Sequence, residues 1–273
     1  MNNDNIRNLI RTALNVKSEI NPEYEFNFRV NFVEKKLIES GLKKVILGIS
    51  GGQDSTLAGK ICQTAIDNLN RKFKTNEYEF VAVRLPYGEQ KDEKDAQLAL
   101  SFIKPTKILT FNIKSAVDAM AEEFYNTIGK KPRDFDKGNV KARIRMVAQY
   151  FLEAEDGALV IGTDHAAEVV TGFYTKFGDG AADVLPLSGL TKRQGKEILK
   201  YLNAPEQLYL KTPTADLLDE NVAQPDETEL GITYEQIDDY LEGKLINKEV
   251  AEKIEKRYLI TQHKRDLPYT PFD

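Results

Sequence analysis

The chain has 273 residues, 41% of them hydrophobic and 30% charged, and it carries a net charge of −5 at pH 7. These values predict a globular protein that buries a full core as one large domain or two small ones. The acidic balance argues against a broad nucleic-acid-binding surface, no apolar run approaches a membrane span, and the single Cys62 excludes a disulfide framework within the chain. The N-terminus lacks the apolar segment of a secretory signal, so we expect a cytoplasmic protein with no membrane partner.

Residues 1–40 have helical spacing, and four apolar runs then recur along the chain, each followed by a segment with helical spacing. The runs are Val45 to Leu47, Phe80 to Val83, Ile108 to Phe111 and Ala158 to Ile161. This alternation is typical of an α/β fold, so we predict a doubly wound parallel sheet with flanking helices. Ligands of such sheets bind at the carboxyl ends of the strands, where Arg84 and the segments 48–55 and 162–164 fall.

Segments outside the predicted strands have the apolar spacing of helices or the composition of long loops. Apolar stripes predict packing helices after the first strand, from Leu57 to Leu69, and after the second, from Ala96 to Ile103. Residues 140–154 predict a helix with a wide apolar face for the core or for a partner subunit, made of Val140, Ile144, Val147, Ala148, Phe151 and Leu152. Long loops are predicted at 174–189 and 205–230. We expect 205–230 and also 84–91 to order when ligands bind.

The segment Gly48-Ile49-Ser50-Gly51-Gly52-Gln53-Asp54-Ser55 follows an apolar strand and precedes a helix. Gly51 and Gly52 let backbone amides approach an anion, and the helix start adds free N–H groups and a positive dipole end. The segment therefore predicts a phosphate site, although it lacks the G-x-x-x-x-G-K-[ST] pattern of the Walker loop. A glycine-rich turn that only packs closely is the structural alternative.

Two carboxylates are expected beside this phosphate site. Asp54 lies within the loop, and Glu168 lies about one turn into a helix that begins after Gly162-Thr163-Asp164. A carboxylate beside phosphate is repulsive unless a cation lies between them, so Asp54 and Glu168 predict a bound Mg²⁺. A glutamate that only complements the helix dipole is the alternative for Glu168. The two histidines, His165 and His263, are too few for a His-rich metal site, and one cysteine excludes a thiolate zinc cluster.

The pattern Ser-Gly-Gly-x-Asp-Ser at 50–55 resembles the pyrophosphate loop of the N-type ATP pyrophosphatases, which implies a Rossmann-like fold of the adenine nucleotide alpha hydrolase type. Within that superfamily, Lys176 to Leu187 with Leu190-Thr191-Lys192 is similar to the ammonia-dependent NAD⁺ synthetases. Gly162 to Glu168, Pro213 to Leu217 and His263-Lys264 fit the same family in the same order. The resemblance covers nearly the whole chain and implies a single domain over residues 1–273.

This resemblance implies an enzyme that uses ATP, deamido-NAD and ammonia, with Mg²⁺ as its cofactor. The nicotinate carboxylate attacks the α-phosphorus of ATP and releases pyrophosphate, and ammonia then displaces AMP to leave the amide of NAD⁺. Activation is needed because a carboxylate is a poor electrophile and oxide is a poor leaving group. A glutamine-using enzyme needs a nucleophilic cysteine, whereas Cys62 lies on the apolar stripe of a predicted helix, so we expect free ammonia to be the substrate.

The resemblance also implies roles for individual residues. Expected ATP-binding residues are Gly48, Ile49, Ser50, Gly51, Gly52, Gln53, Asp54, Ser55, Arg84, Thr163, Lys192 and Thr214. Expected deamido-NAD-binding residues are Phe135, Arg143, Phe173, Lys176, Asp183, His263 and Lys264. Expected metal ligands are Asp54 and Glu168, and expected catalytic residues are Asp179, Lys192 and Asp54. An aromatic side chain at 135 or 173 is also common in a core, so stacking on the dinucleotide is one of two interpretations there.

Two catalytic assignments have simpler alternatives. Asp179 is expected to position or deprotonate the incoming nitrogen, but a carboxylate of ordinary pKa is a poor base for ammonium. It serves either to bind and desolvate the cation or, more simply, as a solvent-facing loop residue. Lys192 either meets phosphate oxygens as charge builds during transfer or lies on the surface at the start of a helix.

Two other functions stay open from the sequence. A related adenylating amidotransferase or sulfur-transfer enzyme would share the loop and act on a different carboxylate. A nucleotide-binding sensor would keep the ATP cradle without the chemistry, although Asp54, Glu168, Asp179 and Lys192 are all retained. The resemblance and the apolar face of 140–154 together predict a homodimer whose dinucleotide site borrows residues across the interface.

Overall fold

The computed structural model describes residues 3–89, 93–154, 157–212, 217, 219 and 225–272. Its strands form one parallel sheet in the order β3-β2-β1-β4. They are β1 Lys44–Gly48, β2 Glu79–Arg84, β3 Lys107–Thr110 and β4 Leu159–Val160. All four apolar runs expected to be strands lie in this sheet, and the expected parallel α/β fold is confirmed.

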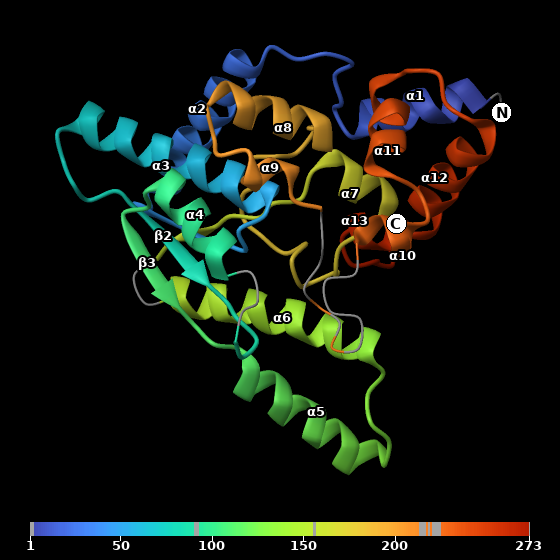
Figure 1. Ribbon diagram of the computed structural model, residues 1–273. Helices are drawn as coiled ribbons and strands as arrows, with labels where there is room; N and C mark the ends of the chain where they lie inside the picture. The colour runs from blue at the N-terminus through green and yellow to red at the C-terminus, as the bar shows by residue number, and fades with distance from the viewer. Residues whose placement is uncertain are drawn as a thin grey trace.

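Helices make up most of the remaining described chain (Figure 1). They are α1 Asn3–Ala13, α2 Pro22–Ser40, α3 Gln53–Phe73, α4 Glu93–Ile103, α5 Lys114–Ile128, α6 Asp134–Glu153, α7 Ala166–Thr171, α8 Lys192–Tyr201, α9 Gln207–Leu210, α10 Asp226–Leu230, α11 Tyr234–Glu242, α12 Lys248–Ile260 and α13 Gln262–Arg265. Among the described residues, none of these helices combines the length and the apolar character that a bilayer span requires.

The sheet is covered on both faces. Successive side chains of a strand point to opposite faces, so Val45 and Leu47 pack in a core cluster with α2, α3, α4 and α8, whereas Ile46 packs in a second cluster with α5 and α6. Figure 1 shows α2, α3 and α8 above the sheet and α6 and α5 below it. This arrangement is the doubly wound architecture expected from the sequence. A continuous apolar strand such as β1 suits it, because a strand in this position is buried on both faces.

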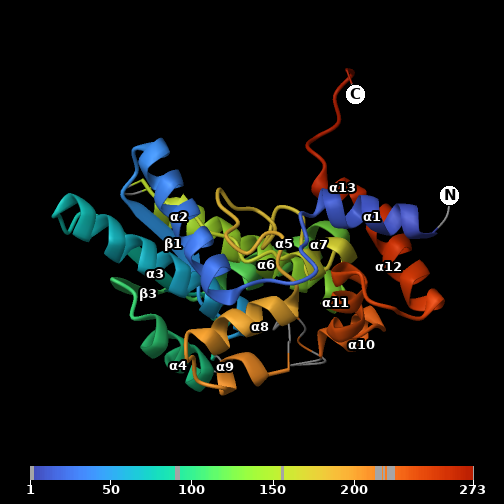
Figure 2. The same cartoon turned by 90° about the horizontal axis from the view of Figure 1, so that it is seen from above.

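A third core cluster lies beyond the sheet and involves α1, α7, α10, α11 and α12. Both views show α1 beside α11 and α12 at the side of the molecule away from β3 (Figures 1 and 2). Tyr240 is fully buried in this cluster, and Ala166, Ala167 and Val170 bring α7 into it. The cluster thereby fixes α7, whose N-terminus faces the candidate site.

The apolar face of α6 divides between core and surface. Ala148 is buried, and Val140, Ile144 and Leu152 pack against the cluster on that side of the sheet. Phe151 is nevertheless 71% exposed and Val147 is 52% exposed. Part of this face therefore serves the core, and part has no cover within the described chain.

The expected long loop at 205–230 was wrong in part, because α9 and α10 lie within it. Each helix is anchored by burial: Leu208 and Tyr209 enter the core around β1, and Leu230 enters the cluster around α11. Helices of four and five residues are too short to show apolar periodicity in a sequence. The segment 174–189 is irregular as expected, apart from an isolated parallel bridge between Ile161 and Val184.

Candidate functional site

A cavity of about 310 Å³ lies at the carboxyl ends of β1 and β4. This is the edge at which parallel α/β sheets bind ligands, and the volume is at the lower end of small-molecule pockets. The expected site residues that line it are Gly48, Ile49, Ser50, Gly52, Gln53, Asp54, Ser55, Thr163, Glu168, Phe173, Asp179 and Lys192. Segments far apart in the sequence therefore meet at one place, as their positions after the strands predicted.

The glycine loop is held in a fixed turn between β1 and α3. Gly51 has a φ of +86°, and an added Cβ would lie 2.5 Å from the backbone nitrogen of Ala96, so only glycine fits without a shift. The hydroxyls of Ser50 and Ser55 are 3.0 Å apart, and the Thr56 hydroxyl donates to the carbonyl of Gly52 at 2.7 Å. The first turn of α3 then presents N–H groups that have no partner within the helix. The loop has the geometry of an anion cradle.

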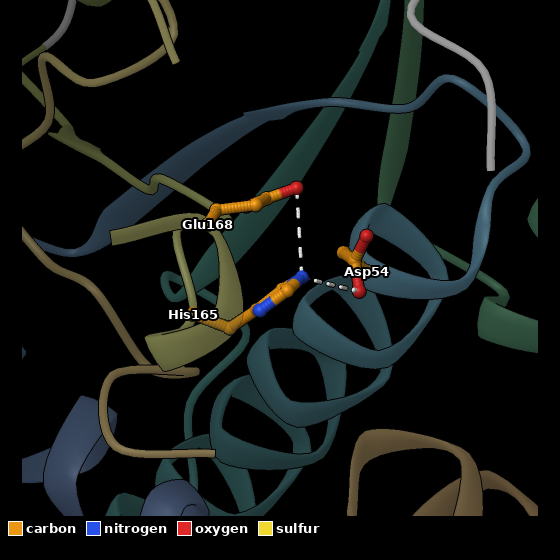
Figure 3. Close-up of side chains that lie close together, drawn as sticks. All are labelled: Asp54, His165 and Glu168. Atoms are coloured by element: carbon orange, nitrogen blue, oxygen red, sulfur yellow. Dashed lines mark ion pairs between the residues drawn. The ribbon is translucent and has the colours of Figure 1, made fainter. Parts of the chain in front are cut away.

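Three potential metal ligands meet beside this loop (Figure 3). Asp54 comes from the first turn of α3, His165 is the N-cap of α7, and Glu168 lies in the first turn of α7. His165 Nε2 is 3.6 Å from Asp54 Oδ1 and 3.5 Å from Glu168 Oε1. One ligand atom from each residue lies within 4.8 Å of the others. Helix α3 and helix α7 thus direct their N-terminal ends at a shared cluster.

Lys192 is part of the same site and is not a surface residue. Its Nζ donates to Asp54 Oδ2 at 2.6 Å, and its side chain is 11% exposed. The position of Lys192 is set by α8, which Thr191 and Gln194 begin with a capping box. Asp238 also accepts the backbone N–H groups of Lys192 and Arg193, at 3.1 and 2.7 Å. These contacts fix the first turn of α8 against the glycine loop.

The ionisable groups of this site change one another's pKa values. Burial opposes the ionisation of Asp54, but the charge of Lys192 and its hydrogen bond outweigh burial and lower the pKa of Asp54. Burial and then the charge of Asp54 raise the pKa of Glu168 well above its ordinary value. Burial also lowers the pKa of His165 to about 4, so the imidazole is neutral at pH 7. A buried site with two carboxylates and one ammonium group favours an additional cation.

Asp179 lies at the rim of the cavity, where its side chain is accessible to solvent. Its Oδ1 accepts the backbone N–H of Thr175 at 2.9 Å. Although one side of the carboxylate is open to solvent, the protein around it removes part of its hydration and raises the pKa of Asp179 in spite of this bond. Burial and then the charge of Asp179 also raise the pKa of the buried Asp164 well above its ordinary value. Asp179 is therefore a further acidic group of the cavity, and the buried Asp164 lies close enough behind it to be affected by its charge.

Some residues expected to bind the dinucleotide form a chain of contacts beside the cavity. Arg143 donates to the carbonyl of Lys176 at 3.3 Å, and Lys176 donates to the carbonyl of His263. Lys264 donates to the carbonyls of Gly172 and Tyr174 at 2.7 and 2.6 Å. These contacts bring α6, the segment after α7 and α13 together. Phe173, which precedes Tyr174, lines the cavity itself.

Other expected residues are not brought to the cavity in this structure. Phe135 is 56% exposed at the start of α6. Asp183 accepts the backbone N–H of Val160 at 2.8 Å and the Tyr150 hydroxyl at 3.3 Å, which ties the segment after Gly180 to β4. Arg84 ends β2 and pairs with Glu93 of α4. Thr214 lies outside the described residues.

Several described residues of the site were not predicted from the sequence, and His165 and Gln149 are two of them. Two histidines in the chain do not predict a histidine-rich site, yet the spacing of three between His165 and Glu168 at a helix start places both on one side of α7. Gln149 lines the cavity from α6, and its Oε1 accepts the N–H of Gly48 at 2.8 Å. No sequence pattern indicated Gln149, since it is a polar residue within the predicted apolar helix.

Comparison with known proteins is consistent with this geometry. The family model "NAD synthase" matches residues 25–268. The NH3-dependent NAD⁺ synthetase of Bacillus velezensis is 58% identical over 98% of both chains. The crystal structure of the NAD⁺ synthetase of Burkholderia pseudomallei superposes with a TM-score of 0.82, at 46% identity and 96% coverage of each chain. The NMN synthetase of Francisella tularensis has a TM-score of 0.79 at 32% identity and covers 93% of this chain and 99% of its own. The chain belongs to the NAD synthase family.

Proposed function

We propose that this chain uses ATP to join ammonia to the nicotinate carboxylate of deamido-NAD, with NAD⁺, AMP and pyrophosphate as products. The name and the 58% identity of the Bacillus velezensis relative support this reaction. The observation that carries the proposal is the convergence of a glycine loop, Asp54, Lys192 and Asp179 on one cavity. In one cavity, the loop can bind phosphate, Lys192 and a cation on Asp54 can neutralise the phosphate charge, and Asp179 can bind ammonium.

In the first step, an oxygen of the nicotinate carboxylate attacks the α-phosphorus of ATP, and the bond from that phosphorus to pyrophosphate breaks. The loop from Gly48 to Ser55 holds the β and γ phosphates at the positive end of α3. Lys192 stabilises the charge that builds on the phosphate oxygens, because its ammonium is fixed beside the loop before the reaction begins. Thr163, which lines the cavity, contacts the adenylate portion, Arg84 does so once it exchanges Glu93 for the nucleotide, and Thr214 contacts phosphate.

Asp54 and Glu168 hold Mg²⁺ in this proposal, because carboxylate oxygens are the ligands that Mg²⁺ prefers in proteins. When bound, the ion neutralises the charge of the phosphates. The donor set of this chain fits such an ion: the ammonium group of Lys192 donates to Oδ2 of Asp54, whereas Oδ1 lies 3.6 Å from Nε2 of His165. A ligand atom of Glu168 lies within 4.8 Å of one from each of these two residues. One carboxylate oxygen of Asp54 therefore accepts a hydrogen bond from the ammonium group of Lys192, and the other is available to bind a metal.

In the second step, ammonia attacks the carbonyl carbon of the adenylate, the bond from that carbon to the AMP oxygen breaks, and the attacking nitrogen loses a proton to solvent at the open rim of the cavity. Asp179 binds ammonium at the rim of the cavity and accepts its proton. Its raised pKa suits this role better than that of an ordinary carboxylate, since a proton acceptor works best with a pKa nearer the working pH. Phe173 and the contact chain through Lys176 and Lys264 hold the dinucleotide beside it.

The active form is a homodimer in this proposal. Met120, Phe124 and Ile128 recur every four residues on α5, so they form one stripe, and all three are exposed. Val147 and Phe151 are exposed on the neighbouring α6. An apolar surface of this kind marks an interaction site more often than a solvated face. A second copy of the chain would cover it and extend the dinucleotide site across the interface.

Sedimentation velocity at micromolar concentration tests the dimer. The Phe124→Glu variant should sediment as a monomer, because a charge would be buried in the interface. Leu245→Glu is the matched control, since Leu245 is fully exposed in the turn between α11 and α12, away from α5. A wild-type monomer, or identical behaviour of the two variants, would contradict the proposed interface.

An assay of products tests the reaction. The chain is incubated with ATP, Mg²⁺, ammonium and deamido-NAD, and parallel reactions contain nicotinate mononucleotide in place of the dinucleotide. We expect NAD⁺, AMP and pyrophosphate in equal amounts, with the dinucleotide preferred. Faster turnover of the mononucleotide would instead assign the chain to the reaction named for the Francisella tularensis neighbour. ATP binding without AMP formation would indicate a sensor.

A further inference from the structure

Asp238 is a buried carboxylate on α11 that binds the start of α8. It is 2% exposed, and its oxygens accept different donors: Oδ1 accepts the backbone N–H of Lys192, and Oδ2 accepts that of Arg193. Carboxylates are seldom this buried unless they are paired, because removal of the charge from water is costly. Both donors lie in the first turn of the helix that carries Lys192. This position indicates that Asp238 contributes to the placement of that residue.

Protein groups bind the N–H groups at the start of α8. The first N–H groups of a helix have no partner within it, and at a phosphate site they are available to an anion. In α8, Asp238 accepts the N–H groups of the first two residues, and the hydroxyl of Thr191 accepts that of Gln194 at 3.1 Å. Asp238 therefore takes the place of an anionic ligand. The turn is oriented by the protein itself, and it contributes the side chain of Lys192 to the cavity.

Lys192 is also held at its carbonyl and at its ammonium group. Gln53 of the glycine loop donates to the carbonyl of Lys192 at 2.8 Å. Lys192 Nζ lies 5.0 Å from the ring centre of Tyr234, which is within the range of a cation–π contact. Tyr234 and Asp238 are four residues apart on α11, so they lie on one face of that helix. This face of α11 therefore contacts both the backbone and the side chain of Lys192.

Helix α11 is itself anchored away from the cavity. Tyr240 and Leu241 are fully buried in the core cluster beyond the sheet. Arg7 of α1 also donates to the carbonyl of Tyr240 at 2.8 Å. A helix that is fixed in this way can hold a charged side chain in place before a reaction begins.

We propose that Asp238 and Tyr234 are positioning residues, which hold the ammonium group of Lys192 beside Asp54 for attack on the α-phosphorus. A charge that is fixed in advance stabilises a transition state because no reorganisation is needed at the moment of reaction. This role rests on the proposed function, since Lys192 acts there on phosphate oxygens. The placement of the ammonium group is nevertheless a property of the folded chain, and it can be observed without catalysis.

Steady-state kinetics of Asp238→Asn test this role, with Asp239→Asn as the matched control. Asparagine keeps the side-chain volume but offers one acceptor oxygen, and its NH₂ group would face an N–H donor. Asp239 accepts from the side chain of Arg193 at 2.8 Å, so its replacement removes the same charge and leaves the backbone of α8 bound. Burial raises the pKa of Asp238 to about 7, so the assays are run at about pH 8.5, where the carboxylate is ionised.

We expect kcat of Asp238→Asn to fall by at least about 10-fold while KM for ATP changes by less than about threefold, because Lys192 acts on charge that develops in the transition state. Both constants should change by less than about threefold in Asp239→Asn, which leaves Lys192 in place. Equal values of kcat for the two variants would overturn the proposal.

A double-mutant cycle with Lys192→Met separates positioning from a general loss of structure. Asp238→Asn should lower kcat by less than about twofold in the Lys192→Met background, because a residue that acts through Lys192 then has no ammonium group to position. A further fall as large as that in the wild-type background would overturn the proposal.

Two variants of Tyr234 test the same face of α11 with Asp238 in place, so they decide the matter even if Asp238→Asn does not fold. Tyr234→Phe keeps the ring and should retain kcat within about twofold, whereas Tyr234→Leu should lower kcat by at least about fivefold. Equal effects of the two substitutions would exclude a role for the ring.

Crystal structures of Asp238→Asn and Asp239→Asn give a readout that does not depend on the reaction. We expect Lys192 Nζ to leave Asp54 Oδ2 in the first variant and to keep the 2.6 Å contact in the second. An unmoved Lys192 in Asp238→Asn would overturn the proposal. A wild-type chain that forms no AMP would refute the proposed function, and these structures would still decide whether Asp238 positions Lys192.

Discussion

Replacement of Gly51 by alanine should destabilise the fold far more than the same change at the neighbouring Gly52. At Gly51 the φ of +86° is unfavourable for an L-residue, which costs about 1–2 kcal/mol. The added Cβ would also lie 2.5 Å from the nitrogen of Ala96 and 2.7 Å from the carbonyl carbon of Asp95. Overpacking of this kind typically costs about 1–3 kcal/mol, so the total is roughly 2–5 kcal/mol.

Two other glycines separate the cost of the backbone conformation from the cost of overpacking. Gly52 has a φ of −84°, and the nearest atom to an added Cβ is Ser50 Oγ at 3.5 Å, which is ordinary contact. Gly129 has a φ of +73° but nothing within 4 Å, so it reports the backbone penalty alone. We therefore expect the loss of stability to fall in the order Gly51→Ala, Gly129→Ala, Gly52→Ala.

Thermal unfolding by circular dichroism measures this order. A shift of about 2–4 °C per kcal/mol in a chain of this size gives a decrease of roughly 4–20 °C for Gly51→Ala. ATP affinity should fall as well, since the loop must move to relieve the contact with α4. Equal melting temperatures for Gly51→Ala and Gly52→Ala would refute the account of why the loop contains this glycine.

Three further predictions concern the carboxylate cluster and the segment after α8. The Asp54→Asn variant should have a turnover at least about 100-fold lower, with little change in the melting temperature, because the substitution removes a charge without changing the side-chain volume. If the residual activity depended on Mg²⁺ as the wild type does, a metal ligand at this position would be excluded. The pKa of His165 is lowered from 6.5 to about 4 in the folded protein. As pH falls from 7 to 4, the imidazole is therefore protonated in the unfolded chain before it is protonated in the folded protein, and the free energy of unfolding decreases. Urea unfolding in the presence of a chelator should show that His165→Phe loses about 3 kcal/mol less than the wild type between pH 7 and pH 4, and an equal loss would argue against the buried neutral ring. Protease cleavage between residues 205 and 230 should slow when ATP and deamido-NAD bind, whereas equal rates with and without ligands would contradict closure of this segment.

The sheet could be predicted because each strand contains an apolar run that is followed by a helical stripe; β1 and β2 are buried, whereas the edge strand β3 is largely exposed. The same rule failed for α9 and α10, since four or five residues do not complete enough turns for a stripe to appear. Their helical form depends instead on the burial of Leu208 and Leu230 in cores built by distant segments. Local patterns cannot report such contacts.

The candidate site was predictable where its residues follow strands and only partly elsewhere. Asp54 and Glu168 stand at strand-to-helix junctions, so parallel topology alone brings them to one edge. The pairing of Lys192 with Asp54, 138 residues away, depends on the docking of α8 and could be expected only from resemblance. His165 could not be predicted from the number of histidines in the chain. It is a potential ligand because its buried ring nitrogens have no hydrogen-bond partner among the described residues and lie beside two carboxylates.

In the proposed reaction, the nicotinate carboxylate is adenylated before ammonia attacks. Deamido-NAD labelled with ¹⁸O in its nicotinate carboxylate tests this order of steps directly, because attack of that carboxylate on the α-phosphorus carries one labelled oxygen into AMP. We predict that mass spectrometry will find one ¹⁸O atom in each AMP and none in pyrophosphate. Unlabelled AMP, or ADP and orthophosphate as products, would contradict the account.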